Sequence, residues 1–367
     1  MLRHFSLSSR ASSIICGPWA VSRRHLVVGN SKNGVRPTVN IDWEDIVGFD
    51  SAIVNRLVAG ELLAMMDLCA KRVADIFLSP LKQNISASTV GVTNTRFVSP
   101  VLHGDAIRMN GRLVFCGSSS LGIHIEFFRR SPSTLQETPA GESYFTMVAI
   151  GKDLHALKVV PAVELTDEGD ISLHNRYMLL RQRAKEEEKA ARVMKECDVC
   201  LEDLECDINK SKLSLVPISS TRTAAHRIFL LYHLNNNRTI FGGELMRWME
   251  KHAVHCGRMF TGNRHIYTVG MHSVAFHQPV FGTDWVKLEA DVVYVHNTTM
   301  EVDVRLTVER EGRVVITNRA SFVLFNSDEI GQKIVIPKGL DLRSATREES
   351  LRYSEAKARC QRRLESR

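Results

Sequence analysis

The same series of segments occurs twice in the sequence, and this duplication restricts the fold more than any other feature. A Phe-x-x-Pro-Val motif begins at Phe97 and recurs at Phe276. The same separation relates the short polar turns that begin at Ser119 and Thr298. Apolar residues alternate with polar ones after each motif, which predicts antiparallel strands. The pattern therefore indicates two copies of one domain in a single chain.

A strongly apolar segment precedes each predicted set of strands. The two segments, 59–77 and 242–260, both contain Gly-Glu-Leu near their start and continue with apolar residues on nearly every side. A helix that is apolar almost all round is expected to be buried. Each half is therefore predicted to be an α+β unit, in which an antiparallel sheet wraps around one central helix.

A charged stretch separates the two halves. Residues 180–196 place opposite charges at helical spacing, for example Glu188 and Arg192, which predicts a solvated linker helix. The tail has similar character and is predicted to be an exposed helix or disordered. The predicted division is a presequence and flexible lead at 1–41, a first domain at 42–160, a charged helical linker at 161–211, a second domain at 212–337 and a charged tail at 338–367.

The positive charge is concentrated at the start of the chain. The whole sequence has 48 Lys plus Arg against 41 Asp plus Glu, but residues 1–41 hold six basic residues and no acidic one. The rest is close to neutral, which argues against a nucleic-acid partner. A segment rich in Arg and Ser that lacks acids is typical of a mitochondrial presequence, so we expect a mitochondrial location, in the matrix. No apolar run is long enough to predict a membrane-spanning helix.

The cysteines and the short motifs favour neither a disulfide framework nor a metal site. Eight cysteines are scattered through a long chain, which favours a reducing compartment. Cys197-x-x-Cys200 with Cys206 lacks a fourth ligand at suitable spacing, so no metal is predicted. The chain also has no Gly-x-Ser-x-Gly elbow and no His-Glu-x-x-His motif.

Over about residues 42–335 the sequence resembles the hotdog-fold acyl-CoA thioesterases with two tandem hotdog domains, most closely their mitochondrial members. The resemblance rests on the two helix openings, the Phe-x-x-Pro-Val-x-x-Gly-Asp signature at 97–105, the Gly-Ser-Ser turn at Gly117, and the segment NNNRTIFGG at 235–243. It implies two hotdog domains that form an intramolecular pseudo-dimer. It also implies further assembly, as a trimer of such double hotdogs.

The resemblance identifies candidate site residues by position. In this family an Asn lies seven residues before a Gly pair, and a carboxylate lies eight residues after the first Gly. Counted from Gly242, these positions are Asn235 and Glu250. The same count in the first half gives Asp67 for the carboxylate, but Ala52 at the Asn position. Each half thus keeps one partner of the usual pair, and Asn237 is an alternative to Asn235 if the loop is shifted by two residues.

Helix geometry indicates how one complete site can still form. Eight residues span about 12 Å of helix, so a carboxylate cannot reach a thioester held at the start of its own helix. Asp67 would instead meet Asn235 and Gly243 of the other half, while Glu250 would face Ala52 in an incomplete second site. Asp67 is the expected general base on a water molecule, with direct attack by its carboxylate as the alternative, and Asn235 would orient the water or the carbonyl. The amide of Gly243, at a helix N-terminus, would stabilise the oxyanion.

The resemblance implies hydrolysis of acyl-CoA to free fatty acid and CoA, with no cofactor beyond the CoA of the substrate. Dehydration is disfavoured because no histidine occurs in residues 51–67. We expect an acyl pocket beside the helix, lined by Leu63, Met66 and Trp248. The alternative is a catalytically silent tandem hotdog protein with a binding or assembly role in mitochondria, favoured by the incomplete residue pairs and the charged linker.

Overall fold

The computed structural model describes residues 35–47, 52–53, 56–81, 84–196 and 214–365. The greater part of the predicted presequence lies outside these residues. The Cys197, Cys200 and Cys206 group also lies outside them.

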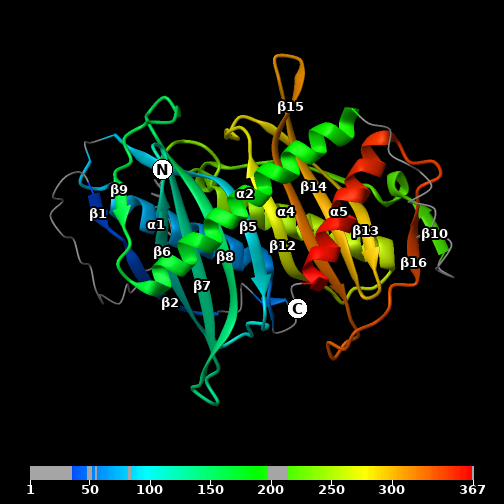
Figure 1. Cartoon of the computed structure of the whole chain (residues 1–367). Helices are drawn as coiled ribbons and strands as arrows, with labels where there is room; N and C mark the ends of the chain where they lie inside the picture. The colour runs from blue at the N-terminus through cyan, green and yellow to red at the C-terminus, as the bar shows by residue number, and fades with distance from the viewer. Residues whose placement is uncertain (1–34, 48–51, 54–55, 82–83, 197–213, 366–367) are drawn as a thin grey trace, which may run out of the picture.

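The core of the molecule is one continuous ten-stranded sheet to which both halves contribute five strands (Figure 1). Its order is β11-β13-β14-β15-β12-β5-β8-β7-β6-β2, so the strands of the second half mirror those of the first. The halves join where β12 pairs antiparallel with β5, with Val274 opposite Val92. The strands are β2 (Asn40–Ile46), β5 (Ser86–Phe97), β6 (Ala106–Cys116), β7 (Ser120–Arg130), β8 (Glu137–Ile150), β11 (Thr223–Ile228), β12 (Ile266–Phe276), β13 (Trp285–His296), β14 (Thr299–Arg310) and β15 (Arg313–Asn326).

Two buried helices lie against one face of this sheet. Helix α1 spans Ala59–Leu78 and helix α4 spans Gly242–Thr261, close to the two predicted segments. Apolar side chains surround α1 on almost every side because it packs against its own sheet and against α4. The α+β class and the two tandem hotdog domains are therefore confirmed, and the joined sheet makes them a pseudo-dimer within one chain.

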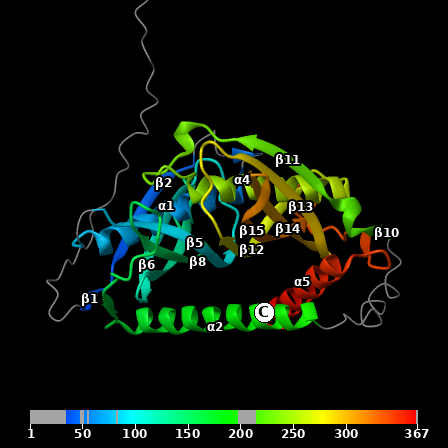
Figure 2. The same cartoon turned by 90° about the horizontal axis from the view of Figure 1, so that it is seen from above.

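The linker forms a long helix on the opposite face of the sheet. Helix α2 (Glu168–Glu196) begins well before the predicted start at Leu180 and crosses the outer face of the first half (Figure 2). Its buried Tyr177 hydrogen-bonds Thr146 of β8 at 2.9 Å. The remaining elements are β1 (Val35–Pro37), β3 (Ala52–Ile53), β4 (Arg56–Leu57), β9 (Ala162–Glu164), β10 (Ser214–Pro217), β16 (Lys338–Asp341), η2 (Ile218–Thr221) and η3 (Leu231–His233).

The sequence predicts that the tail is an exposed helix or disordered; it does form a helix, but that helix is packed and partly buried, so the predicted exposure is wrong. Helix α5 (Arg347–Glu365) packs on the outer face of the second half, against β13. Its arginines find acidic partners on the strands: Arg352 Nη1 lies 2.8 Å from Asp291 Oδ2, and Arg359 Nε lies 3.0 Å from Glu301 Oε2. Both carboxylates are 1% exposed. A charged sequence pattern cannot reveal such burial, because the compensating charges come from strands that are distant in the sequence.

The two outer helices also contact each other across the junction of the halves. Arg362 of α5 donates to Glu187 of α2 at 2.6 Å, and His272 Nε2 of β12 lies 3.5 Å from the same carboxylate. Helix α2, which packs on the first half, therefore also contacts strand β12 and helix α5 of the second half. Within the described residues, no helix is long and apolar enough to cross a membrane.

Candidate active site

Asp67 lies at the interface between the two halves. It is part of α1 and is 2% exposed. Its Oδ1 accepts a hydrogen bond from the Thr89 hydroxyl at 2.6 Å, and its Oδ2 accepts the backbone N–H of Gly243 at 2.8 Å. Gly243 is the second residue of α4, where unpaired amides and the helix dipole favour an anion. The structure therefore brings together two of the candidate residues, one from each half.

The glycine pair at the start of α4 permits this close approach. A Cβ atom on Gly243 would lie 2.8 Å from the backbone Cα of Ala64, and one on Gly242 would lie 3.0 Å from Asp67 Oδ2. The 2.8 Å distance is shorter than the contacts that real Cβ atoms make with backbone atoms. A larger residue at Gly243 would therefore push α4 away from α1. Glycine is thus required here for space, and its conformational freedom is not the reason.

Burial alters the acidity of Asp67. Removal from water raises its pKa from 3.8 to about 6, while hydrogen bonds from Thr89 and Gly243 and the charge of Lys71 lower it in part. A carboxylate with this pKa is mostly ionised at neutral pH, yet it is a stronger base than an exposed aspartate. General bases work best when their pKa lies near the working pH. Asp67 has the acidity that such a role requires.

Glu250 occupies the equivalent position with the halves exchanged. It lies on α4, is 3% exposed, and accepts the Thr268 hydroxyl at 2.6 Å and the backbone N–H of Gly60. Burial raises the pKa of Glu250, which these hydrogen bonds lower in part. The surroundings of the Ala52 side chain lie outside what the structure describes. Glu250 therefore accepts the same two kinds of hydrogen bond as Asp67, one from a threonine hydroxyl and one from a glycine amide. Its catalytic role stays a prediction.

Asn235 lies in the loop between η3 and α4. Its side-chain oxygen accepts the amides of Asn237 at 2.8 Å and Thr239 at 3.2 Å, and its Nδ2 donates to the Thr239 hydroxyl at 2.9 Å. These bonds stabilise the turn that leads into α4. Within the described residues, no hydrogen bond links this carboxamide to Asp67. Its catalytic role stays a prediction, as does that of the alternative, Asn237.

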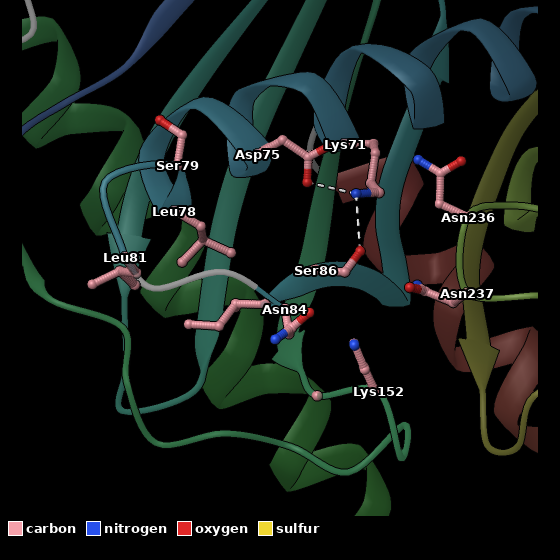
Figure 3. Close-up of a pocket in the computed structure, with 12 residues that line it drawn as sticks. Lys71, Asp75, Leu78, Ser79, Leu81, Asn84, Ser86, Lys152, Asn236 and Asn237 are labelled. Atoms are coloured by element: carbon pink, nitrogen blue, oxygen red, sulfur yellow. Dashed lines mark hydrogen bonds and ion pairs between the residues drawn. The ribbon is translucent and has the colours of Figure 1, made fainter.

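A pocket of about 430 Å³ lies along the second half of α1, beyond Asp67 (Figure 3). Both halves line it, since Asn236 and Asn237 reach it from the loop that also carries Asn235. The three residues predicted to line an acyl pocket are not among its lining residues, and Leu63 and Met66 are fully buried in the core. The lining residues are Lys71, Asp75, Leu78, Ser79, Leu81, Asn84, Ile85, Ser86, Gly151, Lys152, Asn236 and Asn237.

Sequence reasoning missed the two threonines that bond the carboxylates. Thr89 and Thr268 have the same separation in the sequence as the repeated Phe97 and Phe276 motifs. That spacing is the signal that could have identified them, because a threonine at one register position in both copies of a strand suggests a shared contact. Among the described residues, no group of three His, Cys, Asp or Glu side chains could hold a metal ion.

The fold and this crossed carboxylate arrangement define a double hotdog protein, and comparison with known proteins gives the family. A family model for the thioesterase superfamily matches residues 237–315. An uncharacterized acyl-CoA thioester hydrolase of Zymomonas mobilis is 31% identical over 118 residues, which cover 31% of this chain and 76% of that protein. The chain therefore belongs to the thioesterase superfamily, a family of thioester-hydrolysing enzymes.

Longer relatives match both halves. The acetyl-coenzyme A thioesterase of Rattus norvegicus is 24% identical over 314 residues, covering 83% of this chain and 53% of that protein. The chain thus spans about half the length of this relative. Among solved structures, an apo-hexameric acyl-CoA thioesterase is 26% identical and covers 42% of this chain and 97% of its own, with a TM-score of 0.39.

Proposed function

We propose that the chain hydrolyses acyl-CoA to free fatty acid and CoA at a composite site between its two hotdog domains. The observation that carries this proposal is the buried Asp67 carboxylate of one half against the helix N-terminus of the other, 2.8 Å from the Gly243 amide. The relatives named as acyl-CoA thioester hydrolases support the substrate class.

In the proposed reaction Asp67 accepts a proton from a water molecule that attacks the thioester carbonyl carbon. The carbon–sulfur bond then breaks, and the CoA thiolate leaves and takes up the proton that Asp67 had accepted, which returns Asp67 to its carboxylate form. The Gly243 amide donates its single hydrogen to Asp67 in the described geometry. As Asp67 becomes protonated its oxygens become weaker acceptors, so we infer that this amide turns to the developing oxyanion. Asn235 would orient the water or the carbonyl.

A thiol-release assay on the purified full chain tests this proposal. We expect CoA release from acyl-CoA substrates over a series of chain lengths, with the preferred length reported by kcat/KM. If no acyl-CoA of any length releases thiol above the uncatalysed rate, the proposal fails. The silent binding or assembly protein would then be the better description.

The acid limb of the pH profile gives a more specific test. Because the pKa of Asp67 is about 6, we expect kcat/KM to fall as the pH drops through about 6 and the carboxylate is protonated. The hydroxyl of Thr89 lowers this pKa, so Thr89→Val should move the acid limb to higher pH. Thr134→Val, in an exposed turn, is the matched control. An unchanged limb in Thr89→Val would show that Asp67 does not set it.

We also propose a mitochondrial matrix location, from the acid-free basic segment at 1–41. Fusing these residues to a fluorescent reporter should direct it to mitochondria. Replacing the six basic residues by Gln should abolish this targeting, because the positive charge is then lost. A reporter that stays elsewhere with the unchanged segment contradicts the proposal.

The trimer of double hotdogs remains a proposal as well. Light scattering on the purified protein tests it, since the expected mass is three times that of one chain. A mass equal to that of one chain would contradict further assembly.

A further inference from the structure

Most side chains that line the pocket beyond Asp67 are charged or polar, whereas a pocket for an acyl chain would be mainly apolar. Its lining includes two lysines, Lys71 on α1 and Lys152 in the turn after β8, and one acid, Asp75. Lys71 lies one helical turn beyond Asp67. Its Nζ is held by Asp75 Oδ1 at 2.5 Å and Ser86 Oγ at 3.2 Å. Figure 3 shows the Lys71 ammonium group turned to Asp75 and Ser86, and the Lys152 ammonium group on the other side of Ser86 in this view.

Neutral hydrogen-bond donors also line the pocket, beside the apolar residues Leu78, Leu81 and Ile85. The side-chain amides of Asn84, Asn236 and Asn237 add N–H groups from segments of both halves. An aliphatic chain in this pocket would remove these groups from water without replacing their hydrogen bonds, which is unfavourable. An oxyanion would satisfy them, and charge-assisted hydrogen bonds to ammonium groups are among the stronger polar interactions.

The duplication offers an internal comparison for Lys152. The turn after β8 has Gly151 N donating to His155 O at 3.0 Å, and the turn after β15 has Asp328 N donating to Gln332 O at 2.9 Å. The two turns are therefore equivalent, and Lys152 corresponds to Glu329. The fold thus accepts either charge at this position, so the lysine is not required for folding.

The other charged positions differ between the halves as well. On the helices, the equivalents of Lys71 and Asp75 are Val254 and Arg258. Glu329 pairs with Arg264 at 3.3 Å. The second half therefore has cations of its own near Glu250, but it lacks counterparts of the two lysines that line this pocket. The double-lysine arrangement is specific to the first carboxylate.

We propose that this pocket binds an anionic group of the thioester substrate, with Lys152 and Lys71 as its cations. The inference rests on the proposed function, since it assigns part of the substrate to a place beside Asp67. Two parts of a thioester can supply the anion: the phosphates of the CoA moiety, or a carboxylate at the far end of the acyl chain. Both present oxygens that accept from ammonium and amide donors.

Charge reversal at Lys152 distinguishes these sources. Lys152→Glu is compared with the wild type on three substrates: an acyl-CoA, the same acyl group on N-acetylcysteamine, and an N-acetylcysteamine thioester whose acyl chain ends in a carboxylate. If the phosphates bind here, KM rises about tenfold or more for the acyl-CoA alone. If a carboxylate binds here, the same rise appears for the third substrate and not for the second. Lys158→Glu, an exposed lysine outside the pocket, is the matched control and should change none of the three.

Equal KM values for Lys152→Glu and wild type on the first and third substrates would overturn the inference and leave the proposed hydrolysis standing. If no thioester is hydrolysed at all, calorimetry with CoA and with a free dicarboxylate as probes still decides it. Binding of one probe that Lys152→Glu weakens supports the anion site. The inference is overturned if neither CoA nor the dicarboxylate binds the wild type. It is also overturned if the wild type and Lys152→Glu bind the probes equally well. Lys152 is exposed, so the variant should fold, which thermal unfolding checks.

Discussion

Asp67→Asn is expected to lower kcat for acyl-CoA hydrolysis by about 10² to 10⁴, because general-base catalysis typically contributes that much. The substitution keeps the shape of the side chain. Its amide oxygen can still accept the Gly243 amide, and the rotatable Thr89 hydroxyl can accept from the new NH₂ group. The loss of activity should therefore reflect the missing base and not a missing contact. Thiol release under saturating substrate measures it.

The Asp67→Asn variant should lose activity without losing stability. The pKa of Asp67 is raised in the folded protein, so the stabilising contribution of its protonated form is present below about pH 3.8 and is lost as the pH rises through about 6. At neutral pH and above the buried charge is destabilising, and the neutral Asn should unfold at an equal or higher temperature. A drop in melting temperature under those conditions would contradict this reasoning.

Glu250→Gln is the matched control, because the chain supplies the same carboxylate, threonine and glycine arrangement in its other half. We expect it to reduce kcat much less than Asp67→Asn, since Ala52 stands at its Asn position. Equal losses in the two variants would mean that both carboxylates work. A large loss in Glu250→Gln alone would exchange the two assignments.

Arg359→Ala is expected to lower the free energy of unfolding by about 3 kcal/mol, because it removes a partner from a buried carboxylate. Arg359 of α5 lies 3.0 Å from Glu301, which is 1% exposed. Arg363 also contacts Glu301 and will limit the loss. Urea unfolding of the full chain measures the effect.

Arg264→Ala is the control for the predicted loss of stability in Arg359→Ala. Arg264 pairs with Glu329 at 3.3 Å, but the two side chains are 80% and 76% exposed. Exposed ion pairs contribute about 0–1 kcal/mol, so we expect little change. A loss from Arg359→Ala no larger than that from Arg264→Ala would show that α5 does not depend on its buried ion pair.

The sequence determined the architecture because its signals are local or repeat at a fixed spacing. The recurrence of the Phe97 motif at Phe276 predicted two equal domains, and the apolar segments predicted both central helices to within one residue of their ends. The rise of a helix, together with the position of Asp67 eight residues from its start, predicted a carboxylate that serves the other half. The structure places that carboxylate against Gly243.

Only the tertiary structure decided which distant groups meet. It decided that the charged tail is a packed helix, since Asp291 and Glu301 compensate its arginines from another part of the chain. It also decided that Lys71 and Lys152 share a pocket with the Asn236–Asn237 loop. Charge and hydropathy patterns indicate which face of a helix or strand can be exposed to water. A buried ion pair or a pocket depends also on the distant segment that packs against that face. That partner is fixed only when the two halves join into one sheet.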